Sequence, residues 1–330
     1  MRRPDIPGPG HKTSAVSPPL SSHRSQDDHH AADQNGVEKE DAFRLAGLDF
    51  NRFNHRFDPR DEGSAHRSDL GAADRIGRLC RCDLLICHAK ILPTDGTMDT
   101  RLADYDESGF VLEKGLFDRE EIDLLRRSAK EDKQLDDHSF GRNDGEGGTV
   151  RLSLWNHPGQ GIYGAFARCN RLVSIAELLL RDEPYHYHSK MIMKDARVGG
   201  AWAWHQDYGY WYSNGVLTPN LVSAFIAVDP ATRANGCLQI IRGSHHCGRI
   251  HHQLTGDQAG ADPDRVDHIL DRFEHQYVEM DPGDVLFFHS NLLHRSDQNR
   301  SEHPRWSMIC CFNGRRNDPY KDSHHPVSYT

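Results

Sequence analysis

The sequence predicts a mainly β protein, a barrel or jelly roll with helices packed on its flank. Two observations lead to this fold class. After Met98, helix signals come first, and short apolar runs typical of strands follow them. Turn-forming residues, such as Asn235-Gly236 and Asp281-Pro282-Gly283-Asp284, separate these runs and favour an all-β barrel or jelly roll for this part.

Residues 1–97 differ in composition from the rest of the chain. Residues 1–40 are rich in Pro, Ser, His and Asp, and residues 41–90 are dominated by Arg and Asp. Such a segment buries too little apolar surface to offset the entropy lost on ordering it. We therefore expect residues 1–97 to form a poorly structured extension and residues 98–330 to form the folded domain. A translation start at Met98 is the other explanation of this boundary.

A helix after this boundary is predicted by its N-terminal cap. Asp118 is a favourable N-cap, and Glu121 stands three residues later as its partner in a capping box. Ile122, Leu125 and Ala129 then recur at helical spacing, which predicts an amphipathic helix.

Later apolar runs predict a second helix and several strands. The helix covers residues 172–180, where Leu and Ile dominate. The Gly-rich residues 141–148 have no helix or strand pattern around them and are expected to form a flexible loop. The expected strands are residues 185–194, 221–228, 237–241, 284–288 and 306–312.

Charge and hydropathy argue against a nucleic-acid or a membrane partner. With 40 basic and 49 acidic residues the formal charge is −9, whereas a nucleic-acid-binding face needs excess positive charge. The apolar patch at residues 84–92 is interrupted by His88 and Lys90 and is too short to cross a bilayer. The charged N-terminus lacks the apolar stretch of a signal peptide. We expect a soluble, cytoplasmic protein with no nucleic-acid and no membrane partner.

Eight cysteines are scattered along a chain that is not small, so we expect free thiols in a reducing compartment. Cys80-Arg81-Cys82 and Cys87-His88 resemble half of a metal knuckle, but the second matched pair is missing. Cys310 and Cys311 fall in an apolar run, where strand alternation would point them to opposite faces.

The sharpest local motif is Trp204-His205-Gln206-Asp207. On a strand, positions i and i+2 point to the same side, so an imidazole and a carboxylate at this spacing can meet at one cation. His294 follows the apolar run 284–288 and could supply a third ligand. Two His and one carboxylate leave three positions of an octahedron open, as in non-haem Fe(II) oxygenases. A surface His beside a turn-capping Asp is the ordinary alternative for such a pair.

Two companions of His294 favour the metal site. Ser296 is two residues after it, and Arg305 opens the last apolar run. The planar guanidinium suits bidentate pairing with a carboxylate, and the hydroxyl adds a donor. Together they form a candidate site for the far carboxylate of a dicarboxylic 2-oxo acid. A rival metal cluster is the His-rich stretch of His245, His246, Cys247, His251 and His252.

Several motifs occur in a fixed order along residues 105–313. They are Tyr105-x-x-x-Gly109-Phe110-Val111; Trp204-His205-Gln206-Asp207 with Trp211; Asn235-Gly236-Cys237-Leu238 leading to Arg242-Gly243-Ser244-His245; and Gly283-Asp284-Val285 through His294-x-Ser296 to Arg305. In order and spacing this segment resembles the phytanoyl-CoA dioxygenase family, which includes bacterial ectoine hydroxylases. Arg242 departs from the family pattern, which usually has Pro at this position.

The resemblance implies a double-stranded β-helix fold (jelly roll, cupin-like) that uses Fe(II) and the co-substrate 2-oxoglutarate. The implied iron ligands, which are also the catalytic residues, are His205, Asp207 and His294. The implied co-substrate site contains Arg305 and Ser296, with Lys190 and Trp211 as further candidates.

The expected function is therefore a 2-oxoglutarate-dependent dioxygenase. Such an enzyme would hydroxylate an unactivated C–H bond of a small organic substrate with O2 and release succinate and CO2. A non-catalytic, cupin-like binding module would keep the barrel without iron. A zinc-dependent hydrolase would use the same His and Asp side chains but would leave Ser296 and Arg305 without a role.

Overall fold

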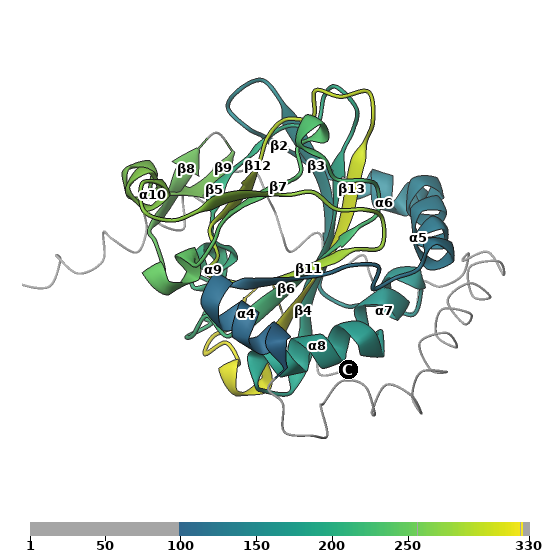
Figure 1. The fold of residues 1–330 in the computed structure, drawn as a ribbon. Coiled ribbons are helices and arrows are strands. Elements are labelled where there is room, and N and C mark those ends of the chain that lie inside the picture. The colour runs from purple at the N-terminus through teal and green to yellow at the C-terminus, as the bar shows by residue number, and fades with distance from the viewer. Residues whose placement is uncertain (1–98, 256, 324, 326–330) are drawn as a thin grey trace, which may run out of the picture. The chain divides into compact units, whose positions relative to one another are not determined.

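The computed structural model describes residues 99–255, 257–323 and 325. Figure 1 shows these residues as antiparallel sheets around one interior, with helices outside the larger sheet. The expected extension over residues 1–97 and the half-knuckle at residues 80–88 lie outside the described residues.

Two antiparallel sheets form the body of the fold within the described ranges. The larger sheet has the strand order β1 (Phe110–Glu113), β11 (Val285–His289), β6 (Leu221–Ala227), β13 (Arg305–Gly314), β4 (Pro184–Lys194), β3 (Thr149–Trp155) and β2 (Phe140–Asn143). The smaller sheet has the order β10 (His275–Val278), β7 (Leu238–Ile241), β12 (His294–Ser296) and β5 (Trp202–His205). A separate hairpin joins β8 (His252–Thr255) and β9 (Gln258–Ala261).

The helices are short, and most of them lie between strands in sequence. The α-helices are α4 (Thr100–Ser108), α5 (Arg119–Glu131), α6 (Lys133–Asp137), α7 (Ile162–Ala167), α8 (Asn170–Leu180), α9 (Asp207–Trp211) and α10 (Pro263–Leu270). The 3-10 helices are η3 (Arg233–Asn235), η4 (Ser244–Cys247) and η5 (Arg315–Asn317). Within the described part of the chain, no helix is both long enough and apolar enough to span a membrane.

The mainly β jelly-roll prediction is confirmed, and the expected strands and helices are present with slightly shifted bounds. The capping box before α5 also forms as expected. The Asp118 carboxylate accepts the backbone N–H of Glu121 at 2.9 Å, and the Glu121 carboxylate accepts that of Asp118 at 2.9 Å. Two otherwise unpaired amides at the start of the helix are thereby satisfied.

Further strands occur where none was expected. β1, β2 and β3 lie among the first helices, and β8, β9, β10 and β12 lie among the later, expected strands. The prediction of a loop over residues 141–148 is wrong at its start, where residues 141–143 belong to β2. Gly141 pairs with Arg151 of β3 in antiparallel register. The short β2 sequence Phe-Gly-Arg-Asn has no alternation of its own. β2 is therefore a strand because it pairs with β3, and not because its own residues favour a strand.

Alternation along β4 and β13 divides their side chains between two cores. Met191 belongs to the cluster that packs against α8, whereas Ile192 belongs to the cluster inside the barrel. Cys310 and Cys311 divide in the same way, which confirms the expected alternation. These two cysteines are free thiols, as are the described Cys237 and Cys247.

The turn before β11 tests how strictly the backbone is constrained. Gly283 has φ +96° and accepts the backbone N–H of Phe117 at 3.1 Å. A Cβ at this position would overlap the Phe117 carbonyl oxygen. We expect Gly283→Ala to lower the melting temperature and to cost clearly more than the roughly 1–2 kcal/mol of a left-handed backbone alone.

The matched control is Gly115→Ala, measured by the same thermal and urea unfolding. Gly115 also has a positive φ, +58°, but a Cβ there would meet nothing within 4 Å. Equal losses of unfolding free energy in the two variants would contradict the close approach at Gly283.

Candidate metal centre

His205 and His294 are held side by side by strand pairing. β12 lies between β7 and β5 in the smaller sheet, and His294 is the direct partner of His205 across β5 and β12. Their ring centroids are 4.0 Å apart. Because directly opposed residues on neighbouring strands point to the same face, the register alone brings the two imidazoles together.

Asp207 joins them by a route that the sequence did not predict. The expectation that His205 and Asp207 share a strand is wrong, because β5 ends at His205 and Asp207 is the first residue of α9. Gln206 fixes this change of direction. Its side-chain amide donates to the carbonyls of Gly248 and Asn291 at 2.8 Å each, and its oxygen accepts the Ile250 N–H at 2.7 Å.

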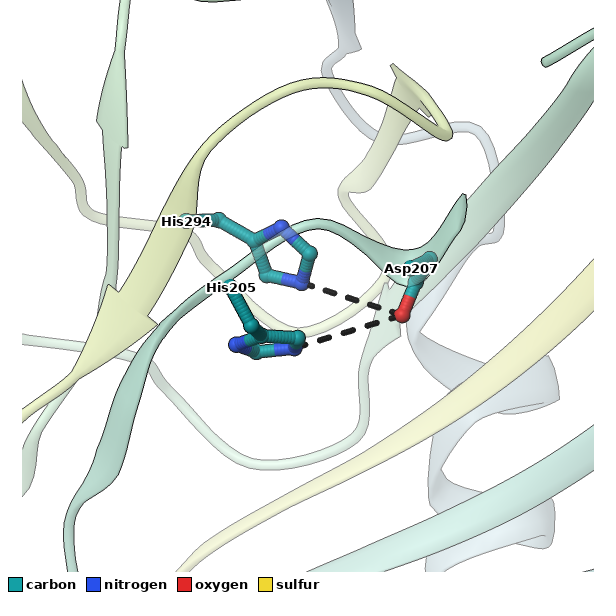
Figure 2. Close-up of side chains that lie close together, drawn as sticks. All are labelled: His205, Asp207 and His294. Carbon is teal, nitrogen blue, oxygen red and sulfur yellow. Dashed lines mark ion pairs between the residues drawn. The ribbon is translucent and has the colours of Figure 1, made fainter. Parts of the chain in front are cut away.

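The three side chains nevertheless converge. The Nε2 atoms of His205 and His294 each lie 4.0 Å from Oδ1 of Asp207. Figure 2 shows both rings presenting one nitrogen toward the same carboxylate oxygen. One ligand atom can be chosen from each residue so that all lie within 4.8 Å of one another, and all three residues are buried. This spacing suits three ligands around a single cation.

The backbone sets which imidazole nitrogen is available. Nδ1 of His205 lies 2.7 Å from the carbonyl oxygen of Ala203, and Nδ1 of His294 lies 2.9 Å from that of Leu292. A carbonyl only accepts, so Nδ1 of each ring carries the proton and donates. In the neutral rings Nε2 therefore keeps its lone pair, which is the form that a metal requires.

The electrostatics keep the ligand set in its metal-binding form. Burial lowers the pKa of His294, although the Asp207 carboxylate opposes this shift. Burial and the neighbouring His294 hold the pKa of His205 well below its usual range. Burial alone would raise the pKa of Asp207, but Lys190 and the two histidines lower it to about 2. The site thus offers two neutral imidazoles and one carboxylate at neutral pH.

Two further residues hold Asp207 in place. The Ser223 hydroxyl, from β6, donates to Oδ2 of Asp207 at 2.7 Å. The Lys190 ammonium, from β4, lies 3.6 Å from Oδ1. The structure therefore brings Lys190 to the metal ligands, and Ser223 is a supporting residue that the sequence did not reveal. Its only signal was a hydroxyl within the apolar run 221–228.

Arg305 and Ser296 lie near one another at one end of the barrel. Arg305 is 2% exposed and donates through Nη2 to the carbonyl of Gly236 at 2.8 Å and through Nη1 to the Ser307 hydroxyl at 3.1 Å. Ser296 is buried on β12 opposite Leu238, two residues after Gly236. Nε of Arg305 is buried without a hydrogen-bond partner in the described structure, so part of this guanidinium is free for a ligand.

Trp211 lies apart from these contacts. It ends α9 and is buried edge-on against Tyr187 and His188, with ring centroids 5.5 and 5.7 Å away. Its role in co-substrate binding stays a prediction.

The rival histidine cluster has structural contacts of its own. Nε2 of His252 accepts the backbone N–H of Gln206 at 2.9 Å, and Nε2 of His245 lies 3.1 Å from the Asp106 carbonyl. Arg242, at the position where Pro was expected, reaches Glu107 at 3.0 Å. Among the residues that the structure describes, one group of His, Cys, Asp and Glu could hold a metal, and it is His205, Asp207 and His294.

Comparisons with known proteins agree with this geometry. The family model described as phytanoyl-CoA dioxygenase (PhyH) matches residues 105–307. The L-proline trans-4-hydroxylase of Streptomyces griseoviridis is 30% identical over 194 residues, covering 54% of this chain and 71% of the relative. The ectoine dioxygenase of Halomonas elongata is 27% identical over 248 residues, covering 69% and 75%.

A solved structure shares the fold. EctD from S. alaskensis, crystallised with 2-oxoglutarate and 5-hydroxyectoine, aligns with a TM-score of 0.60 at 24% identity. The alignment covers 72% of this chain and 84% of that chain. The two-sheet arrangement in Figure 1 is thus the jelly roll of a known oxygenase.

Removing the Ser223 hydroxyl tests the metal centre without touching a ligand. Ser223→Ala leaves Oδ2 of Asp207 without its donor, and we expect the affinity for a divalent cation to fall by about 10- to 100-fold. Titration of the metal-free protein with Mn(II), followed by electron paramagnetic resonance, measures this.

Ser290→Ala is the control, because the buried Ser290 hydroxyl donates at 2.7 Å to the Pro219 carbonyl and not to any of the three ligands. Unchanged Mn(II) affinity in Ser223→Ala would show that the Ser223 hydroxyl does not support Asp207 as a metal ligand.

Proposed function

The chain belongs to the phytanoyl-CoA dioxygenase family, and from this premise we propose that it is a 2-oxoglutarate-dependent hydroxylase that holds Fe(II) with His205, Asp207 and His294. The observation that carries the proposal is the convergence of two Nε2 lone pairs on one carboxylate oxygen inside the barrel. Folded as one domain, residues 98–330 would contain the whole site.

The donor set fits ferrous iron. Two imidazoles and one carboxylate leave coordination positions open, whereas structural zinc sites are closed. Bound there, iron would supply the activation of O2 that the side chains themselves lack. The chain's own part is to hold the ligands in one protonation state. The carbonyls of Ala203 and Leu292 fix the ring tautomers, and Ser223 orients Asp207.

Arg305 and Ser296 support 2-oxoglutarate as the co-substrate. A buried guanidinium with an unpaired Nε can bind a carboxylate strongly, because the interaction is charge-assisted and shielded from water. Lys190, beside Asp207, is positioned to balance the charge of the co-substrate's other carboxylate near the metal ligands. A 2-oxo acid with carboxylates at both ends matches these two cationic positions.

The walls around the ligands favour a small organic substrate. Phe288 lies 4.7 Å from His294 between ring centroids, and Tyr210 lies 5.8 Å from His205. Such apolar walls exclude water from the reacting atoms. The named relatives act on L-proline and ectoine, and we propose hydroxylation of a C–H bond in a compound of similar size, with succinate and CO2 as the other products.

Replacing a ligand tests the proposed activity directly. We expect the wild-type protein to convert 2-oxoglutarate to succinate only with Fe(II) and O2, and His205→Ala to reduce this to background, since two ligands do not replace three. Succinate is quantified by mass spectrometry.

His268→Ala is the control, because His268 lies on α10 with its side chain 67% exposed. Succinate formation at the wild-type rate by His205→Ala would refute the proposed site. Absence of any turnover and of any 2-oxoglutarate binding in the wild type would favour the cupin-like binding module.

Arg305→Met tests the co-substrate site. The substitution keeps volume but removes the charge, so we expect the KM for 2-oxoglutarate to rise by about 10- to 100-fold. Initial rates of succinate formation against 2-oxoglutarate concentration measure it.

Arg126→Met serves as the control, because Arg126 pairs with Asp229 at 3.1 Å and with Asp123 of its own helix. An unchanged KM in Arg305→Met would place the co-substrate elsewhere.

A further inference from the structure

Two buried cations face one another inside the barrel. Lys194 of β4 and Arg305 of β13 are direct partners across the two strands, so their side chains project to the same face. Lys194 is 0% exposed and Arg305 is 2% exposed. Like charges directly opposed on a sheet are destabilising, and burial makes an unpaired charge more costly still. An anion bound between the two side chains would offset this electrostatic cost.

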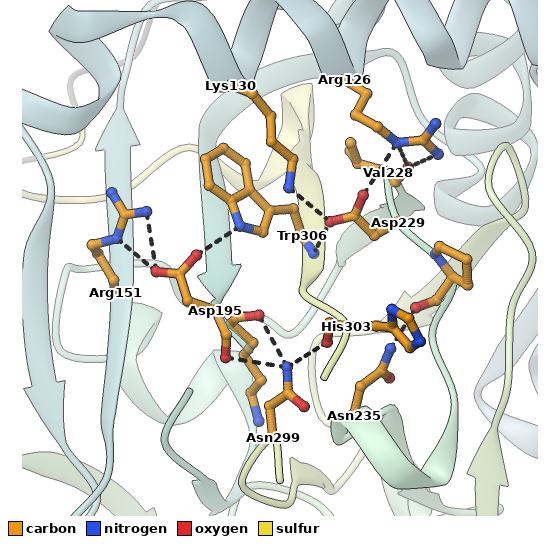
Figure 3. A network of polar contacts seen from close by, with 12 residues as sticks. Arg126, Lys130, Arg151, Asp195, Val228, Asp229, Asn235, Asn299, His303 and Trp306 are labelled. Atoms are coloured by element: carbon orange, nitrogen blue, oxygen red, sulfur yellow. Dashed lines mark hydrogen bonds and ion pairs between the residues drawn. The ribbon is translucent and has the colours of Figure 1, made fainter. Parts of the chain in front are cut away.

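The neighbouring carboxylates are engaged by other groups, as Figure 3 shows for Asp195 and Asp229. Asp195, next to Lys194 in sequence, accepts the Trp306 indole N–H at 3.1 Å and pairs with Arg151 at 3.2 Å. Asp229 accepts the Trp306 backbone N–H at 3.0 Å and pairs with Lys130 at 3.3 Å. Asp195 is thus held by β3 and β13, and Asp229 by α5 and β13.

Two other nearby carboxylates are also satisfied elsewhere. Asp297 pairs with Arg295 and accepts the Gln239 amide at 2.7 Å. Asp144 accepts the Gln298 amide at 2.9 Å together with backbone amides of its own loop. Within the described ranges, neither Lys194 nor Arg305 has a carboxylate within 4.0 Å, so both cations lack an anionic partner.

The two cations reach the same end of the barrel. The Lys194 ammonium donates to the carbonyl of Asp297, the residue after Ser296. Arg305 donates to the carbonyl of Gly236, and a Cβ at Gly236 would overlap the Asp297 carbonyl oxygen. The two accepting carbonyls are therefore neighbours. An ammonium has three donors, and among the described residues that of Lys194 finds one acceptor.

We propose that Lys194 is a second cation for the far carboxylate of the dicarboxylic 2-oxo acid, acting with Arg305 and Ser296 as a positioning residue. This inference rests on the proposed function and extends it. Lys194 and Arg305 would together bind the distal carboxylate and so select co-substrates that have one. Ligand-free, burial and the neighbouring Arg305 hold the pKa of Lys194 well below its usual range. Binding of a carboxylate favours the charged form of Lys194, and the ammonium then pairs with that carboxylate.

The opposing explanation is that Lys194 only ties β4 to the Asp297 carbonyl. The melting temperature does not separate the two explanations, because Lys194→Met removes the donor of the Asp297 carbonyl in both. Ligand binding separates them, since only a Lys194 that binds the co-substrate predicts a loss specific to the distal carboxylate.

The experiment compares two ligands in the full chain loaded with Mn(II). Isothermal titration calorimetry measures the Kd of 2-oxoglutarate and of 2-oxopentanoate, which has the same length but lacks the distal carboxylate. Lys194→Met and Lys194→Gln are measured beside Lys130→Met. Lys130 is the control because its ammonium lies 4.3 Å from the Trp306 ring and pairs with Asp229 outside the interior.

We expect both Lys194 variants to bind 2-oxoglutarate at least about tenfold more weakly and 2-oxopentanoate as well as the wild type does. Lys130→Met should leave both values unchanged. Wild-type affinity for 2-oxoglutarate in the Lys194 variants overturns the inference and leaves the proposed function standing. Equal weakening for both ligands also overturns it, because the loss is then not specific to the distal carboxylate. Failure of the wild type to bind 2-oxoglutarate overturns the inference together with the function.

Discussion

The pairing of β5 with β12 is the constraint on which the centre depends. It sets His205 against His294 and leaves the third ligand to the turn that follows β5. That turn is held by the buried Gln206 amide, which satisfies groups from two separate segments, residues 248–250 and Asn291. A one-residue shift in register would turn His294 to the opposite face, so the ligand set forms only when the strands pair in the native register.

Charge organises the rest of the interior. Asp207 is the carboxylate at the metal ligands, and Lys190 balances it. Lys194 lies further along β4, the strand of Lys190, and faces Arg305 of β13; neither has an anionic partner among the described residues. Two inward-facing cations without a carboxylate partner suit this interior to anionic ligands, since binding of an anion removes an electrostatic cost. The outer carboxylate Asp229 ties the larger sheet to α5, whereas Asp195 joins β3 and β13, and both leave this interior charge in place.

Much of the site could be predicted from the sequence, since ordered spacing is visible in the chain. His205, Asp207 and His294 come together as expected, but β12, which carries His294, was not among the expected strands. Tertiary pairing was not visible: β2 is a strand because β3 pairs with it, and Asp207 lies on a helix because Gln206 turns the backbone. Lys194 could have been found, because Lys190 and Lys194 share the parity of one predicted strand. Its importance appears only once Arg305 is seen opposite.

The central claim is that three side chains hold one ferrous ion while a cationic end of the barrel holds its co-substrate. Anaerobic titration of the metal-free protein with Fe(II) and 2-oxoglutarate tests it most directly, because chelation produces a visible metal-to-ligand charge-transfer absorption. We predict that this band appears only when both are present and saturates at one Fe(II) per chain. A colourless mixture at saturating Fe(II) and 2-oxoglutarate would contradict the claim.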